Sequence, residues 1–442
     1  MKIKAMEITH RTVWRIAGPM MLSNLSVPLL GMVDSAVVGH LDRPGYLGAV
    51  AVGATLFDFL YLGLNFLRMG TTGVTAQAAG RGDAGAVRAT LAQSLLIALA
   101  LAFGLIALQW PLRRIGLALI APTPAVLPLA QTYFDVRIWA APAVLADYAL
   151  VGWFLGLGNA RAPLALVVTV NVINAALDVI FVSGFGMDVG GVALASVIAE
   201  YGGLALGLVL TARALRRHPA PWRRASVFNR AGLGKLMGVN ANLFVRTICL
   251  MFAFGFFTAM SARLGTVVLA ANAILLNLQS LLSYALDGFA HAAESLTGRA
   301  AGRGDAALFN RTVRLTLGWS IGAATLFALL YGLAGDAVIG LLTSLPDVRA
   351  TALRYLPWMV ASPLVAVWAF EFDGVFVGTT RAREMRNAML FALAAYLTIW
   401  FVTRPLHNNG LWLAFILFLG ARGVFMGLSY LRLGRRNGFV AL

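Results

Sequence analysis

The sequence AAGRGDA occurs twice in this chain, at residues 78–84 and again at residues 300–306, 222 positions later. The same offset maps the glycines of GWFLG, at residues 152–156, onto those of GVFVG, at residues 374–378. Two independent matches at one spacing indicate an internal repeat that covers about half of the chain. We therefore expect two copies of one structural unit, with any cleft lying between them.

The composition indicates a membrane protein. Of the 442 residues, 60% are apolar and only 12% are charged, and the mean hydropathy is +0.81. So few polar residues cannot cover a water-soluble globule of this length, which excludes a soluble enzyme. One Cys excludes a disulfide scaffold, and the high apolar content excludes a disordered chain. We predict an all-α integral membrane protein.

Apolar runs of about 20 residues, the length that crosses a bilayer, recur along the chain. Twelve fit, and their approximate spans are 14–40, 46–70, 89–111, 132–158, 162–184, 190–212, 236–262, 266–294, 312–343, 350–378, 386–404 and 409–430. Because six is even, the second six-helix bundle enters the membrane from the same side as the first. The two bundles are then related by a pseudo-twofold axis along the membrane normal. We predict an N-terminal lobe at 1–212, a basic cytoplasmic linker at 213–235 and a C-terminal lobe at 236–442.

The positive charge predicts topology. Of the 35 Lys and Arg residues, 24 fall on the side of the N-terminus, 7 fall on the other side and 4 lie within spans. Because Lys and Arg are retained on the cytoplasmic side, both termini are expected in the cytoplasm. The net charge of +17 would suggest nucleic acid in a soluble chain, but these residues lie in short connectors, so we expect no nucleic-acid partner.

Acidic and amide side chains inside the first lobe are the leading candidates for chemistry. Asp34 and Asp178 lie at matching depth in the outer half of the membrane, and Asn171, Asn174 and Asp178 form one stripe on the fifth span. Ser196 and Tyr133 are expected at the same depth in the membrane as these two carboxyl groups. Two carboxyl groups in a low dielectric are candidate proton carriers, because burial and like charge both favour the neutral acid. The alternative is structural: a cap near a kink at Pro28, or a pair with Arg137.

The second lobe carries polar groups in a different arrangement. Asn272, Gln279 and Asp287 lie on one face of the eighth span, which is too polar for lipid and is expected to line water or the cleft. Arg246 and Asp373 are isolated charges on the seventh and tenth spans. A pair between Arg246 and either Asp287 or Asp373 would reduce the cost of burying them. Structural pairing and substrate contact remain open for these three.

Motifs of enzymes and resident metals are missing from the sequence. The five His residues have no metal-ligand spacing, and the chain lacks HExxH and GxSxG. We therefore expect neither an enzyme nor a cofactor. The RGD within each repeat copy is interpreted as a turn between helices, because no strand precedes it and no Lys-Ser/Thr follows it.

Several longer runs are specific to one family: MVDSAVVGHLDRPGYLGAVAVGA, FLRMGTTGVTAQAAG, NVINAALDV, ALDGFA and FDGVFVGTTRAREMRN. With them the chain resembles the multidrug and toxic compound extrusion (MATE) family, and within it the branch of DNA-damage-inducible protein F (DinF). The resemblance covers nearly the whole length. It implies two six-helix bundles around a V-shaped cleft, and multidrug efflux of organic, often cationic, compounds by an antiporter with alternating access.

The resemblance also implies a coupling site. Asp34 matches a first-helix Asp, Asn174 and Asp178 match a fifth-helix pair, Tyr133 matches a fourth-helix Tyr, and Ser196 stands where relatives have Thr. Pro19 matches a proline at which the first helix bends, and Pro28 is a second candidate bend. The implied coupling ion is H⁺ rather than Na⁺, because Arg246 lies near the position of a Glu in the Na⁺-linked branch.

The remaining expectations concern surroundings and alternatives. We expect a monomer without an obligate protein partner, in the bacterial cytoplasmic (inner) membrane, in contact with lipid and small organic substrates. The alternatives left open are a flippase for lipids or lipid-linked precursors and a Na⁺-coupled exporter. The acidic character of most charges within the spans favours cationic cargo over the flippase.

Overall fold

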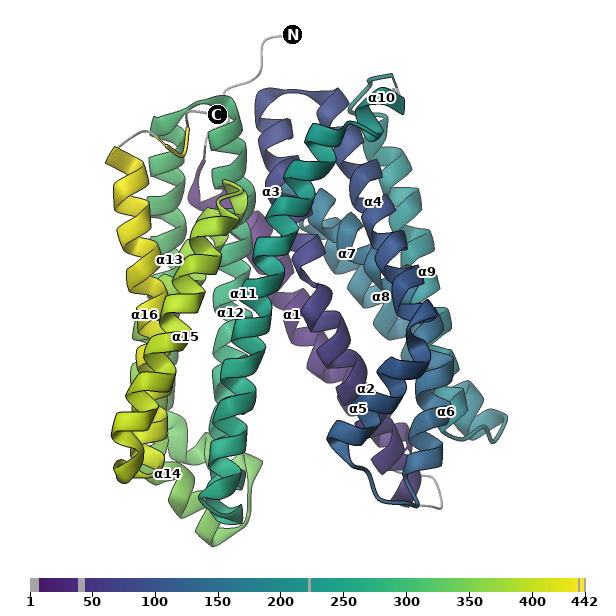
Figure 1. Cartoon of the computed structure of the whole chain (residues 1–442), viewed down its shortest axis with the longest axis vertical. Coiled ribbons are helices and arrows are strands. Elements are labelled where there is room, and N and C mark those ends of the chain that lie inside the picture. Colours follow the sequence, from purple (N-terminus) through teal and green to yellow (C-terminus); the bar gives the residue numbers. More distant parts are fainter. Residues whose placement is uncertain (1–7, 39–43, 222–223, 436–437, 441–442) are drawn as a thin grey trace. The chain divides into compact units, whose positions relative to one another are not determined.

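The computed structural model describes residues 8–38, 44–221, 224–435 and 438–440, apart from the side chains of 27–38, 44 and 224. These residues form helices and no strand. The helices, shown in Figure 1, are α1 (His10–Val38), α2 (Pro44–Leu64), α3 (Phe66–Arg81), α4 (Ala84–Ala107), α5 (Gln109–Ile120), α6 (Leu127–Arg137), η1 (Ile138–Ala140), α7 (Ala141–Gly156), α8 (Arg161–Asp178), η2 (Val179–Gly184), α9 (Val189–Leu215), α10 (Arg224–Val227), α11 (Arg230–Arg263), α12 (Thr266–Arg303), α13 (Ala306–Leu342), α14 (Pro346–Gly378), α15 (Ala382–Thr403), η3 (Arg404–Leu406) and α16 (Asn408–Arg435).

The helices confirm the predicted fold class of an all-α membrane protein. Within the described residues, 11 helical segments are long and apolar enough to cross a bilayer. They coincide with the second to twelfth predicted spans, and the 29-residue helix α1 coincides with the first. Several segments, such as Thr266–Arg303, are longer than the predicted spans because the helix continues beyond the apolar run.

One predicted boundary is wrong. The third span was expected at 89–111, but α4 ends at Ala107 and a separate helix, α5, follows. Leu108 leaves the helical conformation, with φ −95° and ψ 11°. Pro111 then lies in the first turn of α5, where a missing N–H costs no hydrogen bond.

Both copies of AAGRGDA form the same turn. Gly82 and Gly304 each have φ of 72°, the left-handed conformation that suits glycine at the end of a helix. The following residues, Asp83 and Asp305, cap the next helix, and each carboxylate accepts a backbone N–H at 2.8 Å. The repeat is thus a helix stop followed by a helix start, as the interpretation of the RGD as a turn predicts.

The repeated glycines allow helices to pack backbone against backbone. A Cβ added at Gly152 of α7 would lie 2.3 Å from the carbonyl oxygen of Arg68 in α3. A Cβ at Gly374 of α14 would lie 2.3 Å from the carbonyl oxygen of Ala290 in α12. Real Cβ atoms do not approach backbone this closely, so only glycine fits at these crossings. The second pair of repeat matches therefore marks equivalent helix contacts in the two copies.

The chain divides into two compact units. The N-terminal unit comprises Leu22–Ala78 and Gly82–Met237, and the C-terminal unit comprises the residues through Met21, Ala79–Arg81 and the residues from Gly238 onward. In the N-terminal unit α4 packs on α7, α8 packs on α9, and α6 packs on both α2 and α9. The predicted lobes, 1–212 and 236–442 with the linker at 213–235, remain predictions.

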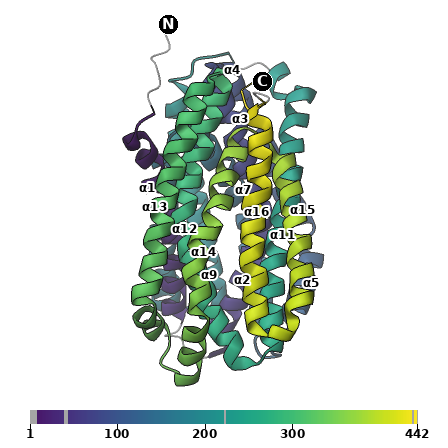
Figure 2. The ribbon, with the colours of Figure 1, turned by 90° about the vertical axis from the view of Figure 1, so that its left-hand side faces the viewer.

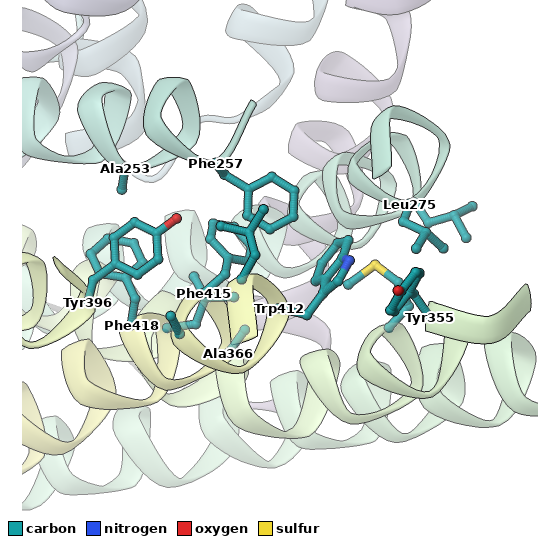
Figure 3. Packing of buried hydrophobic residues seen from close by; sticks show 14 of the residues in the cluster. Ala253, Phe257, Leu275, Tyr355, Ala366, Tyr396, Trp412, Phe415 and Phe418 are labelled. Carbon is teal, nitrogen blue, oxygen red and sulfur yellow. The ribbon is translucent and has the colours of Figure 1, made fainter. Parts of the chain in front are cut away.

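In the C-terminal unit α14 is the central helix, because α12, α13 and α16 all pack against it (Figure 2). Its core is rich in aromatic side chains. Phe257, Trp412 and Phe415 are fully buried, with ring centroids 4.7 Å apart between Phe257 and Trp412 (Figure 3). Aromatic pairs of this kind stabilise more than their buried area alone would, so this unit has a rigid framework for its polar groups.

Candidate functional site

The polar stripe predicted on the fifth span lies on α8 of the N-terminal unit. Asn174 and Asp178 are one helical turn apart, and both are completely or almost completely buried. The Asn174 amide donates a hydrogen bond to the hydroxyl oxygen of Ser196 on α9, at 3.3 Å. The fold therefore brings Asn174 of the predicted stripe next to Ser196 on the adjacent helix, and the role of these residues and of Asp178 in ion coupling remains a prediction.

The backbone changes its winding beside Asp178. The α-helical part of α8 ends at this residue, and Val179–Gly184 continue as a π-helix. A π segment is rare and is frequently found at functional sites. Asp178 thus lies at the junction where the winding of the helix changes.

The same stripe reaches α1. The amide of Asn171 donates a hydrogen bond to the backbone carbonyl of Ser26 at 3.2 Å. The helix α1 runs without interruption past Pro19 and Pro28, and the bend expected at these prolines remains a prediction. Asp34 belongs to α1, but its side chain, like that of Pro28, lies outside the part of the chain that the structure describes.

Tyr133 lies on α6 and packs against α2. Its ring fills the space beside Gly53, where an added Cβ would lie 2.2 Å from the ring carbon Cδ1. Its ring centroid is 6.4 Å from that of Phe57, and only 3% of the residue is exposed. Tyr133 is therefore part of the core that positions α2, and its predicted role in ion coupling remains a prediction.

Two acidic residues of the N-terminal unit were missed by the sequence analysis. Glu200 of α9 pairs with Arg137 of α6 at 3.3 Å, so Arg137 has a partner other than the two Asp residues considered for it. Asp147 of α7 points at the α9 glycines: a Cβ at Gly203 would lie 3.2 Å from its Oδ2. Both are acids isolated in the middle of apolar spans, a signal that the sequence already contained.

In the C-terminal unit the predicted pair between Arg246 and Asp373 forms, joined by a third residue. Arg246 of α11 and Arg422 of α16 both donate to the same oxygen, Oδ2, of Asp373 on α14, the latter at 2.8 Å. Asp287 of α12 is half-buried and attracts Arg422 electrostatically. Asp373 therefore accepts hydrogen bonds from two guanidinium groups, whose positive charge opposes a bound cation there.

Asn272 and Gln279 of α12 connect helices inside the C-terminal unit. Asn272 donates to Ser261 and Asn408, each at 2.7 Å, and accepts from the indole of Trp412 at 2.9 Å. Gln279 accepts a hydrogen bond from Ser362 of α14. Both are 1% exposed. This part of the polar face is buried between helices here and does not line water, because polar partners on three other helices meet it.

Among the described residues no three His, Cys, Asp or Glu side chains are arranged to hold a metal ion. The groups that remain suited to chemistry are buried carboxyl groups with hydroxyl and amide neighbours, which can take up and release protons.

Comparisons with known proteins point to a single family. A family model described as MatE matches residues 19–207 and 243–402. The chain is 42% identical over 434 residues to "DNA damage-inducible protein F" of Escherichia coli K12, covering 98% of this chain and 94% of the relative. It is 25% identical to human "Multidrug and toxin extrusion protein 1", covering 97% and 73%. A solved structure described as "Crystal structure of MATE in the bent conformation" superposes with a TM-score of 0.87 at 18% identity, covering 98% and 97%.

Proposed function

This chain belongs to the MatE family, the multidrug and toxic compound extrusion (MATE) transporters, and on that premise we propose that it exports organic, often cationic, compounds in exchange for protons. It is a membrane-spanning transporter and not an enzyme. The bacterial inner membrane, cytoplasmic termini and a monomeric state are part of the proposal.

The burial of Asp178 carries the assignment of the coupling ion. This carboxyl group is completely buried, one turn from Asn174, whose amide is bonded to Ser196. A buried carboxyl among neutral polar groups favours a proton, because the neutral acid needs no solvation of charge. Asp373 is less suitable, since two guanidinium groups already neutralise it. Their positive charge also opposes Na⁺ there.

The energy of transport sets the number of protons. A hundredfold drug gradient requires about 2.7 kcal/mol. One proton entering across ~100 mV and one pH unit supplies about 2.3 plus 1.4 kcal/mol. For a monovalent drug cation, exchange against one proton cancels the electrical contribution and leaves only about 1.4 kcal/mol, a tenfold gradient. Two protons restore the electrical contribution. We therefore assign Asp34 and Asp178 as a coupled pair of titrating groups.

In this mechanism the two protonation states favour different conformations. Protonation from outside weakens the hold on a cationic drug, which leaves, and deprotonation toward the cytoplasm restores the negative charge for the next drug molecule. The contact of Asn171 with the carbonyl of Ser26 connects the α8 stripe to α1. The π segment after Asp178 gives α8 a place to rearrange.

Efflux driven by a pH gradient tests the proposal. Wild-type protein and the variants Asp34→Asn and Asp178→Asn are compared in everted vesicles with ethidium as the transported cation. Asp336→Asn is the matched control, because Asp336 is an exposed carboxylate at the end of α13. We expect both coupling-site variants to lose pH-driven efflux and the control to retain it. Full efflux in both coupling-site variants would refute the assignment, and no ethidium efflux by the wild type would favour the flippase alternative.

A further inference from the structure

A second buried carboxyl group lies in the C-terminal unit, away from the arginine pair. Glu371 of α14 is 1% exposed. Its two oxygens meet hydroxyl groups that lie one turn apart on α13: Thr316 at Oε1, and Ser320 at Oε2 with a distance of 2.9 Å. The helices α13 and α14 run side by side in both views (Figures 1 and 2). The carboxyl group is thus enclosed between two helices and held by neutral partners.

Its surroundings differ from those of Asp373, two positions further along the same helix. Two residues span about 200° of an α-helix, so these acids face opposite sides. Asp373 is bound by two guanidinium groups. Within the described residues Glu371 has no Arg, Lys or His in a hydrogen bond or ion pair. The helix α14 therefore carries two acids: Asp373, which is paired with positive charge, and Glu371, which is hydrogen-bonded to neutral hydroxyl groups.

The ionisable groups on the helices next to Glu371 interact mainly with other partners. On α12, His291 and Glu294 pair with each other at 3.3 Å. On α16, Arg422 binds Asp373, and the phenol of Tyr430 interacts with Glu371 only through its electrostatic field. On α13, Arg314 acts on the same phenol. The Glu371 carboxyl is therefore held by the hydroxyl groups of Thr316 and Ser320.

Counting hydrogens favours the neutral acid. The Thr316 hydroxyl has one hydrogen to donate but two acceptors beside it. Its oxygen lies 3.0 Å from the carbonyl oxygen of Thr312 and also next to the Glu371 carboxyl. If Glu371 is protonated, it donates to Thr316, Thr316 donates to the carbonyl, and Ser320 donates to Oε2. If Glu371 is ionised, Thr316 must choose between carboxylate and carbonyl. The neutral acid makes one more hydrogen bond and buries no charge.

The ionised form nevertheless keeps two donors. Both hydroxyl groups can turn their hydrogens toward a carboxylate without moving either helix. The site therefore accommodates the acid in both protonation states, whereas a Gln would provide the same structural links without a titratable proton.

We propose that Glu371 is a proton-binding site of the C-terminal unit, separate from Asp178, and that it releases its proton when the transporter binds a cationic drug. The second part rests on the proposed export function, while the protonation of Glu371 does not. The ligand is H⁺ itself, and the hydroxyl pair of α13 is what retains it. The number of protons exchanged per drug molecule is then larger by one than the first unit alone provides.

Infrared spectroscopy of the purified full chain tests the protonation. We expect the wild type at neutral pH to show a protonated carboxyl stretching band that Glu371→Gln lacks and Asp336→Asn keeps. Thr316→Val removes one hydrogen-bond partner of the acid, so the band should remain and shift in frequency. Identical carboxyl bands in wild type and Glu371→Gln would overturn the proposal, and if Glu371→Gln does not fold, an unshifted band in Thr316→Val would overturn it.

Proton release on drug binding tests the coupling. Ethidium is added to weakly buffered protein, and the protons released per bound ethidium are measured with a pH dye. We expect the wild type and Asp336→Asn to release one proton more than Glu371→Gln does. Equal release would overturn the role in drug binding even if the infrared band is present. If the wild type does not bind ethidium, the proposed export of cations fails, and the infrared result still decides the protonation of Glu371.

Discussion

The substitution Gly374→Ala separates the effect of close helix packing from that of helix propensity. The added methyl group would lie 2.3 Å from the carbonyl oxygen of Ala290 and 3.0 Å from the Cβ of Ala293. An ordinary contact begins at 3.4 Å, so α12 and α14 would have to move apart locally by about 1 Å. The obstacle is a helix backbone, which cannot swing away as a side chain can.

The expected cost is that of overpacking a buried contact, about 1–3 kcal/mol. Alanine also favours the helix over glycine by about 0.5–1 kcal/mol, which opposes this cost. Gly322→Ala is the matched control, because an added Cβ at this glycine of α13 meets no atom within 4 Å. The control variant should gain only the stability that comes from the higher helix propensity of alanine. Gly374→Ala should therefore be less stable than Gly322→Ala by about 1–3 kcal/mol.

Stability is measured on purified protein in one detergent by thermal unfolding, with loss of the monodisperse peak in size-exclusion chromatography as the signal. Because membrane proteins unfold irreversibly on heating, all variants are compared at one heating rate. We expect Gly374→Ala to melt below the wild type and Gly322→Ala at or above it. If the two variants melted together, the backbone contact of α12 with α14 would not explain the repeated glycines.

Two further predictions use the same measurement. Asp373→Leu should destabilise the C-terminal unit by about 3–5 kcal/mol, because it removes the carboxylate to which two buried guanidinium groups donate; Asp135→Asn, which breaks an exposed ion pair, should cost at most about 1 kcal/mol, and equal losses would contradict this reasoning. Asp83→Ala and Asp305→Ala should each cost about 1 kcal/mol, since each removes an N-cap hydrogen bond of 2.8 Å; a melting temperature unchanged in both would argue against capping by the repeat.

The sequence predicted the features that depend on neighbours along the chain. Hydropathy over about 20 residues located the membrane helices, because burial in lipid depends on the composition of each segment. The repeat located equivalent turns, since Gly82 and Asp83 stop one helix and start the next through local hydrogen bonds. The spacing of Asn174 and Asp178 placed both on one helix face. The end of α4 was misplaced, because a single residue leaves the helical conformation there, and the predicted second span, 46–70, contains the break between α2 and α3 at Asn65.

The tertiary structure decided which buried groups meet. Only the packing of α13 on α14 shows that Glu371 meets Thr316 and Ser320, which lie more than 50 positions away in the sequence and provide neutral hydroxyl groups. Arg137 meets Glu200 for the same reason. The sequence shows which charges lie within apolar helices, and each of these charges needs a partner. Which partner it finds depends on the register of two helices, and that register is set by close contacts such as the one at Gly374.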